Sequence, residues 1–130
     1  MSVLFIDIDY FKNYNDFYGH QMGDQVLRTL SHMLKQRLRK SDAVGRYGGE
    51  EFIVIFPNTT ADVARMVLEK IRLAFSRVVH VSEHGEFKVG FSAGIADSRQ
   101  TTNPDELLTV ADAALYRAKA NGKNQVVLGE

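Results

Sequence analysis

The chain has 130 residues and a mass of 14.6 kDa, a length that fits one compact domain with a buried core. Its composition, 45% apolar and 25% charged residues, is ordinary for a globular domain and excludes an intrinsically disordered chain. Cysteine is absent and 16 basic residues balance 16 acidic ones, which excludes disulfides, thiolate chemistry and general electrostatic binding to nucleic acid.

The sequence carries neither an export signal nor a membrane segment. Met1 and Ser2 lead directly into an apolar stretch, without the basic flank of a signal peptide. The longest uninterrupted apolar runs are far shorter than the ~18–20 residues that a membrane-spanning helix needs. We therefore expect a cytoplasmic protein that binds neither membranes nor nucleic acid through this chain.

The first half of the chain is predicted to contain three strands and one long helix. The elements are a strand at Val3–Ile8, a helix at Gly23–Leu38 and strands at Ala43–Tyr47 and Phe52–Phe56. The first strand is almost entirely apolar, as in strands buried on both faces, and the helix repeats apolar residues at helical spacing. Between the last two strands, Gly48 and Gly49 are expected to form a tight hairpin with positive φ angles.

The second half is predicted to contain two helices and two strands. The elements are a helix at Ala64–Phe75, a strand at Phe87–Ala96 after a turn at Glu83–Glu86, a helix between Pro104 and Gly122, and an edge strand at Val126–Leu128. Thr59 or Thr60 is expected to cap the first helix. Asn103 is expected to cap the second helix, with Pro104 at its first position and Gly122 at its end.

The predicted order of elements is β-α-β-β-α-β-α-β. This order describes an α+β fold with helices packed on a mainly antiparallel sheet, and it contains the ferredoxin-like βαββαβ core. Because unrelated activities share this topology, the fold alone predicts no function.

Two pairs of acidic residues are predicted to meet at one edge of the sheet. Asp7 and Asp9 stand two positions apart at the end of the first strand, so both side chains point to the same face. Glu50 and Glu51 follow the glycines of the hairpin. Carboxylates about 4 Å apart repel one another by about 4 kcal/mol, a cost that a hard cation such as Mg²⁺ or Mn²⁺ removes. The alternative is that these carboxylates are solvated or cap turns.

Two features of the sequence suit phosphate groups. The segment from Asp9 to Lys12 leads into a helical turn, and free backbone N–H groups at helix starts bind phosphate in many nucleotide sites. Lys119 and Lys123, near the end of the last helix, are further candidates. The alternative for these lysines is a favourable interaction with the C-terminal helix dipole, which needs no ligand.

Arg39 and Asp42 stand three positions apart, just before the hairpin. From spacing alone they are expected to form a local ion pair, which is worth about 0–1 kcal/mol at a surface. The four histidines lack the spacing of metal ligands, and no serine lies in the sequence context of a catalytic nucleophile.

Five blocks of the sequence follow one another in a recognisable order: Asp7–Asp16, Gly19-His20 with Gly23-Asp24, Arg46–Phe52, Ser92–Ala96, and Ala111–Lys119 with Gly122–Asn124. In this order they closely resemble the GGDEF family of bacterial diguanylate cyclases. The third block carries the family signature in its Gly-Gly-Glu-Glu-Phe (GGEEF) form. The resemblance covers essentially the whole chain. It implies that residues 1–130 form one cyclase domain with a palm-like fold, without the family's upstream linker and sensor domain.

The resemblance implies an Mg²⁺- or Mn²⁺-dependent enzyme that works as an antiparallel homodimer. In the family, the 3′-hydroxyl of each GTP attacks the α-phosphorus of the other, which gives cyclic di-GMP and two pyrophosphates. By resemblance, the carboxylates of Asp7 and Glu50 and the carbonyl of Ile8 bind the metal. Glu50, helped by Glu51, takes up the hydroxyl proton.

The resemblance also implies a set of substrate-binding residues. These are Phe11, Lys12, Asn15, Asp24, Gly48, Gly49, Lys119 and Lys123. Asn15 and Asp24 are expected to read the edge of the guanine base. The two lysines and the backbone of the helical turn are expected to hold the β- and γ-phosphates, and the two glycines let the α-phosphate lie against the hairpin.

Arg39 and Asp42 stand at the family's inhibitory site, where they are expected to bind the product cyclic di-GMP and slow the enzyme. Lys123 replaces the arginine that is usual in the family, which keeps the charge but not the bidentate geometry. Two other hypotheses stay open: a catalytically silent receptor for GTP or cyclic di-GMP, and an interaction module. The metal-binding carboxylates favour the enzyme, because a receptor does not need them.

Overall fold

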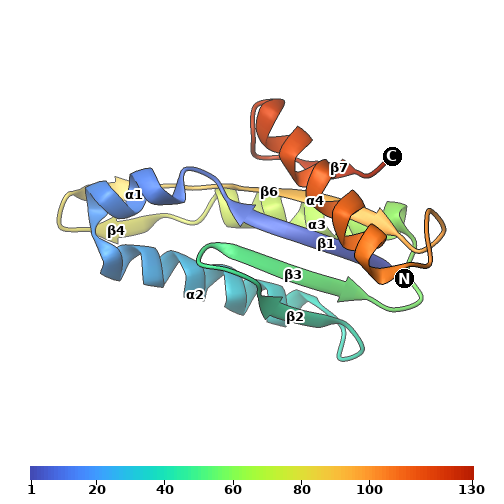
Figure 1. The fold of residues 1–130 in the computed structure, drawn as a ribbon. Coiled ribbons are helices and arrows are strands. Elements are labelled where there is room, and N and C mark those ends of the chain that lie inside the picture. Colours follow the sequence, from blue (N-terminus) through green and yellow to red (C-terminus); the bar gives the residue numbers. More distant parts are fainter.

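The computed structural model describes residues 1–130 and contains a five-stranded sheet, four helices and a small two-stranded hairpin (Figure 1). In spatial order, the sheet consists of β2 (Ala43–Arg46), β3 (Glu51–Phe56), β1 (Ser2–Ile8), β6 (Phe91–Asp97) and β7 (Val126–Leu128). Neighbouring strands are antiparallel except β6 and β7, which are parallel. The predicted α+β fold with a mainly antiparallel sheet is confirmed.

The helices cover both faces of the sheet. They are α1 (Phe11–Tyr18), α2 (His20–Arg37), α3 (Ala61–Ser76) and α4 (Pro104–Ala120). Successive residues of β1 point to opposite faces, so Leu4 and Ile6 pack in the larger core with α2 and α3, whereas Phe5 packs against α4. Figure 1 shows α4 on one side of the sheet and α2 on the other. No helix combines the length and the apolar character that a bilayer crossing demands.

A glycine in β6 fixes the position of α4. A side chain at Gly94 would overlap the backbone of Leu115 and Ala111, so only glycine lets the helix lie this close to the strand. This contact determines where the C-terminal turn of α4, which carries Lys119, lies relative to the sheet.

Local capping signals predict the starts of α3 and α4 correctly. Thr60 Oγ1 accepts a hydrogen bond from Val63 N at 3.5 Å at the start of α3. Asn103 Oδ1 accepts from Asp105 N at 2.9 Å and from Glu106 N at 3.2 Å at the start of α4, with proline at the next position. Each cap satisfies N–H groups that have no partner within the helix.

The strand predicted at Phe87–Ala96 is wrong in its first part, and the turn predicted at residues 83–86 lies partly in a strand. The structure has a separate hairpin of β4 (His80–Ser82) and β5 (Gly85–Phe87), and β6 begins only at Phe91. Phe87 stacks on Tyr18 of α1 with ring centroids 4.0 Å apart and on His80 at 5.1 Å. These contacts turn the hairpin away from the main sheet and towards α1.

The segment predicted as a helical turn is a complete helix. After α1, Gly19 adopts a φ of 94°, and α2 begins at His20 rather than at Gly23. The aromatic residues Tyr14 and Tyr18 of α1 stack with Phe87 of β5, which stabilises this short helix. A short helix has only marginal stability by itself. The local sequence pattern does not reveal the tertiary packing that stabilises α1, so it did not predict the complete helix.

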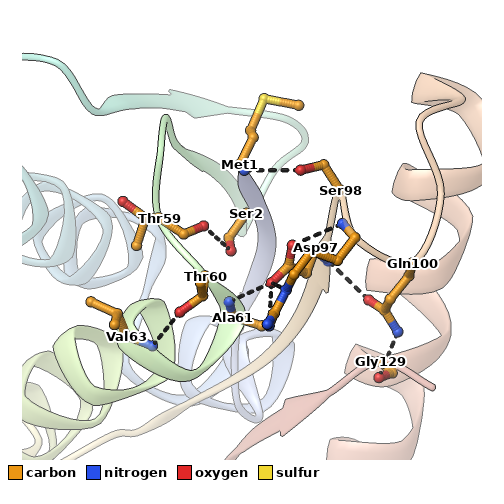
Figure 2. A network of polar contacts seen from close by, with 11 residues as sticks. Met1, Ser2, Thr59, Thr60, Ala61, Val63, Asp97, Ser98, Gln100 and Gly129 are labelled. Atoms are coloured by element: carbon orange, nitrogen blue, oxygen red, sulfur yellow. Dashed lines mark hydrogen bonds and ion pairs between the residues drawn. The ribbon is translucent and has the colours of Figure 1, made fainter.

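The N-terminal end of β1 is anchored by a polar network (Figure 2). Ser2 Oγ donates to the carbonyl oxygen of Thr59 at 2.8 Å. The buried Asp97, at the end of β6, accepts from Ala61 N at 2.8 Å. Both bonds join the sheet to the start of α3. The opposite end of β1, beside the β2–β3 hairpin, carries the candidate site.

Candidate functional site

Asp7 is a largely buried carboxylate near the C-terminal end of β1. Its side chain is 14% exposed, and Oδ2 lies 3.0 Å from Nζ of Lys119. The other oxygen, Oδ1, is buried and has no hydrogen-bond partner. Burial raises the pKa of Asp7 to about 6, with Lys119 acting in the opposite direction and the nearby Glu50 and Glu51 adding to the rise. The ionised form of the Asp7 carboxylate is therefore unfavourable in the folded chain, and a bound cation would stabilise it.

The β2–β3 hairpin brings Glu50 and Glu51 to the end of β1. Asp7 stands opposite Glu51 in the antiparallel register, and Ile8 N donates to the carbonyl of Glu50 at 3.4 Å. Both glutamates are near enough to add to the raised pKa of Asp7, but the three carboxylates do not form one compact cluster.

Gly48 and Gly49 do not form the tight turn that their sequence suggested. Neither glycine has a positive φ angle, and the hairpin closes through a wider loop in which Tyr47 N donates to the carbonyl of Glu51 at 2.9 Å. Arg46 also contacts the carbonyl of Gly49 through its guanidinium. The loop needs no left-handed backbone because it contains more residues than a two-residue turn. Around Gly49 a Cβ would meet no other atom, so the surface there is open.

Asp9 does not join the carboxylate cluster. Its Oδ1 accepts from Ser92 Oγ at 2.6 Å, and its Oδ2 accepts from Asn124 N at 2.8 Å. Asp9 is buried and lies beyond the end of β1, where the strand alternation that predicts a shared face with Asp7 no longer applies. Its role is to tie the turn after α4, which carries Lys123, to the end of β1.

The donor set around Asp7 fits a hard divalent cation. Within this chain no group of three or more His, Asp or Glu side chains lies close enough to hold a metal ion. The oxygen ligands expected from the sequence, the carboxylates of Asp7 and Glu50 and the carbonyl of Ile8, lie at adjoining ends of β1 and the β2–β3 hairpin. The unpartnered Oδ1 of Asp7 is the observation that favours such an ion, since a buried carboxylate oxygen without a donor is costly.

Positive groups gather beside this cluster. Tyr10, in a left-handed conformation with a φ of 57°, precedes α1 and makes no side-chain cap, so the first N–H groups of α1 at Phe11 and Lys12 lack a capping side chain. Lys123 Nζ lies 4.5 Å from the centre of the Tyr10 ring. With Lys119 on Asp7, a helix N-terminus and two lysines surround one end of β1. This arrangement suits an anion with several charges.

Asn15 and Asp24 lie on α1 and α2, near the junction of the two helices. Asn15 Nδ2 lies 2.9 Å from Nδ1 of His20, and Asn15 Oδ1 is buried without a partner. A side chain at Gly23 would overlap Asn15 Oδ1, so glycine there makes room for the amide. Asp24, the next residue, is exposed and lines a cavity together with neighbouring residues of α2.

That cavity has a volume of about 360 Å³ and contains groups that the sequence reasoning did not single out. It is lined by Asp24, Leu27, Arg28, Ser31 and Arg46. Spacings of four and three residues place Asp24, Arg28 and Ser31 on one face of α2, a signal that was present in the sequence. Arg46 comes from β2, and only the folded structure brings it to this helix. The cavity combines a carboxylate, two guanidinium groups and an apolar wall.

Arg39 and Asp42 form the expected ion pair in the loop between α2 and β2. Arg39 Nη2 lies 3.1 Å from Asp42 Oδ1, and Nε and the backbone N of Arg39 donate to Oδ2 at 3.3 and 2.8 Å. The Asp42 side chain is 1% exposed and the Arg39 side chain 60%. The carboxylate raises the pKa of the Arg39 guanidinium, so this charge is permanent.

Comparison with known proteins agrees with this arrangement. Residues 1–125 match the family model described as diguanylate cyclase, GGDEF domain. The chain is 44% identical over 126 residues to diguanylate cyclase DgcM of Escherichia coli, covering 97% of this chain and 30% of the relative. It is 40% identical over 131 residues to diguanylate cyclase A of Treponema denticola, covering 100% and 35%. The chain thus spans about a third of the length of these curated relatives.

Solved structures agree as well. The GGDEF domain of DgcB from Caulobacter crescentus, in complex with c-di-GMP, matches with a TM-score of 0.92 at 35% identity, covering 98% of this chain and 76% of that chain. The active GGEEF domain of a diguanylate cyclase from Vibrio cholerae matches with a TM-score of 0.89 at 34% identity, covering 99% and 82%. Sequence and fold agree over almost the entire length, and the chain belongs to the GGDEF domain family of diguanylate cyclases.

Proposed function

We propose that residues 1–130 form a diguanylate cyclase domain that condenses two GTP molecules into cyclic di-GMP and releases two pyrophosphates. The observation that carries the proposal is the buried carboxylate of Asp7, with one oxygen unpartnered and the other paired with Lys119. A buried carboxylate with one unpartnered oxygen, next to a helix N-terminus, is suited to bind a cation together with a polyphosphate.

The metal ligands in this proposal are the carboxylates of Asp7 and Glu50 and the carbonyl oxygen of Ile8, holding Mg²⁺ or Mn²⁺. When bound, the ion neutralises charge on the phosphates and lowers the pKa of the attacking hydroxyl. Glu50, helped by Glu51, accepts the proton of that 3′-hydroxyl. Most of the remaining acceleration comes from positioning and from stabilising the charge of the transition state.

The substrate is held at both of its ends. The backbone N–H groups of Phe11 and Lys12, together with Lys119 and Lys123, bind the β- and γ-phosphates, which leave as pyrophosphate. Gly48 and Gly49 leave open surface where the α-phosphate lies against the hairpin, in agreement with the free space around Gly49. The reacting α-phosphorus is thereby placed beside the carboxylates.

The base is recognised by Asn15 and Asp24 in this proposal. The carboxylate of Asp24 accepts from the N1–H and the exocyclic amino group of guanine, which adenine cannot offer in the same arrangement. The unpartnered Oδ1 of Asn15 is a buried acceptor that a base N–H would satisfy. This chemistry selects GTP among the nucleoside triphosphates.

The reaction requires two chains. Each chain holds one GTP, and the 3′-hydroxyl oxygen of one nucleotide forms a bond to the α-phosphorus of the other while the bond to pyrophosphate breaks. Two such steps, one at each site, close the ring of cyclic di-GMP. An antiparallel homodimer that places the two hairpins face to face therefore completes the site.

In this proposal, Arg39 and Asp42 form the site at which the product binds and inhibits the enzyme. The guanidinium of Arg39 is exposed and permanently charged, and it offers planar donors to the phosphate and guanine acceptors of cyclic di-GMP. Asp42 orients this group.

The test is incubation of the chain with GTP and Mg²⁺ at several protein concentrations, followed by chromatography of the nucleotides. We expect cyclic di-GMP and pyrophosphate, with an initial rate that rises more steeply than linearly with protein concentration, because two loaded chains must meet. Binding of GTP or cyclic di-GMP without any turnover over this range would show instead that the domain acts as a receptor.

A further inference from the structure

We infer that Thr59 is a positioning residue that holds the Arg39 guanidinium in the orientation required for binding cyclic di-GMP. The inference rests on the proposed product-binding role of Arg39. It adds to that role a residue 20 positions further along the chain, in the loop between β3 and α3, which no sequence spacing connects with Arg39.

The Arg39 guanidinium is held from two sides. Asp42 accepts from Nε at 3.3 Å and from Nη2 at 3.1 Å. On the other side, Thr59 Oγ1 accepts from Nη2 at 2.7 Å and the carbonyl of Pro57 accepts from Nη2 at 3.4 Å, so the bond to Thr59 is the shortest of the four. The Nη1 group makes no hydrogen bond within the chain, so its two N–H groups remain available to an acceptor on a ligand. The direction in which they point is set by the groups that fix Nε and Nη2.

Thr59 is itself rigid. The residue is 7% exposed, and its hydroxyl donates to the carbonyl of Pro57 at 2.9 Å while it accepts from Arg39. The carbonyl of Thr59 accepts from the buried hydroxyl of Ser2 at 2.8 Å, which links it to the central strand β1 (Figure 2). Through Thr59, an exposed arginine is connected to the central strand of the sheet.

The ion pair with Asp42 does not replace this bond. The Arg39 side chain is 60% exposed although Asp42 is buried, so water weakens the pair and the long arginine side chain loses conformational entropy when it is held in one geometry. A ligand that binds a mobile guanidinium has to order that side chain, whereas a ligand that meets a fixed one does not. Thr59 should therefore raise the affinity for product without touching the product.

The experiment compares Thr59→Val with Thr59→Ser and, as a matched control, Thr60→Val. Valine has nearly the shape of threonine but no hydroxyl, and serine restores the hydroxyl. Thr60 is the neighbouring threonine, which caps α3 and makes no contact with Arg39. For each variant of this chain we would measure the Kd for cyclic di-GMP by calorimetry, the initial rate without product, and the thermal unfolding midpoint.

We expect Thr59→Val to bind cyclic di-GMP about three- to tenfold more weakly, the range that corresponds to ordering one long side chain. Its initial rate without product should equal that of the unchanged protein. Thr59→Ser should restore the affinity, and Thr60→Val should lower the unfolding midpoint without changing the Kd. An unchanged Kd in Thr59→Val, or an equal shift in Thr60→Val, would overturn the inference.

A second readout does not depend on product. In an NMR spectrum, the Nε–H proton of Arg39 should exchange with water faster in Thr59→Val than in the unchanged protein. If valine weakens the fold, the same measurement can be made on Thr59→Ala. Arg39→Ala separates the two proposals. If this variant binds cyclic di-GMP normally, the proposed product site is wrong, whereas a loss of binding in Arg39→Ala with normal binding in Thr59→Val refutes only the role of Thr59.

Discussion

Nζ of Lys119 lies 3.0 Å from Oδ2 of Asp7, so the last turn of α4 is joined to the end of the central strand β1 by an ion pair. In the proposed reaction both residues change partner when substrate arrives. Asp7 would hold the divalent cation, and Lys119 would hold a phosphate of GTP. The pair thus keeps two binding groups ordered and compensated before the nucleotide is present, at the cost of a carboxylate whose second oxygen has no partner.

Asp7→Asn should abolish turnover and make the metal-free protein more stable at neutral pH. Burial raises the pKa of Asp7 to about 6, so at pH 7 the folded protein carries an ionised carboxylate that it holds less favourably than the unfolded chain does. A neutral amide removes that cost, about 1–3 kcal/mol of unfolding free energy. Urea denaturation without divalent ions, together with the chromatographic assay, measures both effects.

The pH dependence of this stability gain provides the control. The folded pKa lies above the unfolded one, so the protonated carboxyl stabilises the fold at low pH and this contribution is lost as the pH rises through about 6. The difference between Asp7→Asn and the unchanged protein should therefore disappear near pH 4. If Asp7→Asn is less stable than the unchanged protein at pH 7, the ionised carboxylate of Asp7 does not destabilise the fold and this prediction is wrong.

Glu50→Gln should reduce the rate of cyclic di-GMP formation by at least about a hundredfold, because it removes both a metal ligand and the proton acceptor. Its fold should be unaffected, since Glu50 is only partly buried and forms no side-chain hydrogen bond. Glu86→Gln, on the exposed β5 strand, is the matched control and should leave the rate unchanged. Comparable rates in the two variants would remove Glu50 from the reaction.

Asp24→Asn should lose discrimination between guanine and hypoxanthine. The unchanged protein should prefer GTP over inosine triphosphate, which lacks the exocyclic amino group, by about tenfold or more in kcat/KM. Asparagine presents a single acceptor oxygen, so the preference should fall towards unity. Gln25→Asn, at the next position on α2, controls for general effects on the helix, and a retained preference in Asp24→Asn would assign base recognition to other residues.

The parts of the fold that follow from local chemistry could be predicted from the sequence. Asn103 and Thr60 cap their helices because a cap needs only a side chain and the backbone two or three residues away. The β4–β5 hairpin could not be predicted in this way, because its position depends on stacking between Phe87 and Tyr18, which are far apart in the chain. The same applies to α1, a short helix that this aromatic packing stabilises.

In the candidate site, too, features set by local sequence could be predicted, and features set by long-range contacts could not. Asp7 could be predicted because strand alternation places it, whereas Asp9 lies past the end of β1 and binds Ser92 and a backbone N–H instead. The glycine pair of the hairpin was placed correctly but given the wrong backbone, because the loop length was not evident from the sequence. Arg46 was missed as a lining residue because only the pairing of β2 brings it to the cavity beside Asp24.

His80 should make the protein less stable in acid. It is buried between Phe75 and Phe87 with Nε2 lacking a hydrogen-bond partner, and burial lowers its pKa from 6.5. The unfolded chain therefore takes up the proton first, so the stability that the neutral imidazole provides is lost as the pH falls below about 6.5. In urea denaturation at pH 7.5 and pH 5, His80→Phe should lose less stability than the unchanged protein. His32→Gln, at an exposed position, should follow the unchanged protein.

Gly94 and Gly49 should separate the structural use of glycine from its use in binding. Gly94→Ala should lower the free energy of unfolding by about 3 kcal/mol or more, because the new methyl group overlaps the α4 backbone and no rotamer relieves the overlap. Gly49→Ala should leave stability within about 0.5 kcal/mol, since its Cβ meets no atom and its φ is not positive.

The two substitutions should also differ in how an effect on GTP binding relates to stability. Gly49→Ala should raise the KM for GTP, because the methyl group occupies the surface on which the α-phosphate is proposed to lie. In Gly94→Ala, any weaker binding of GTP should accompany the loss of stability, because a displaced α4 moves Lys119 with it. Thermal unfolding and GTP titration of both variants measure the pair. A stable Gly49→Ala with normal KM and rate would show that the nucleotide does not lie against the hairpin.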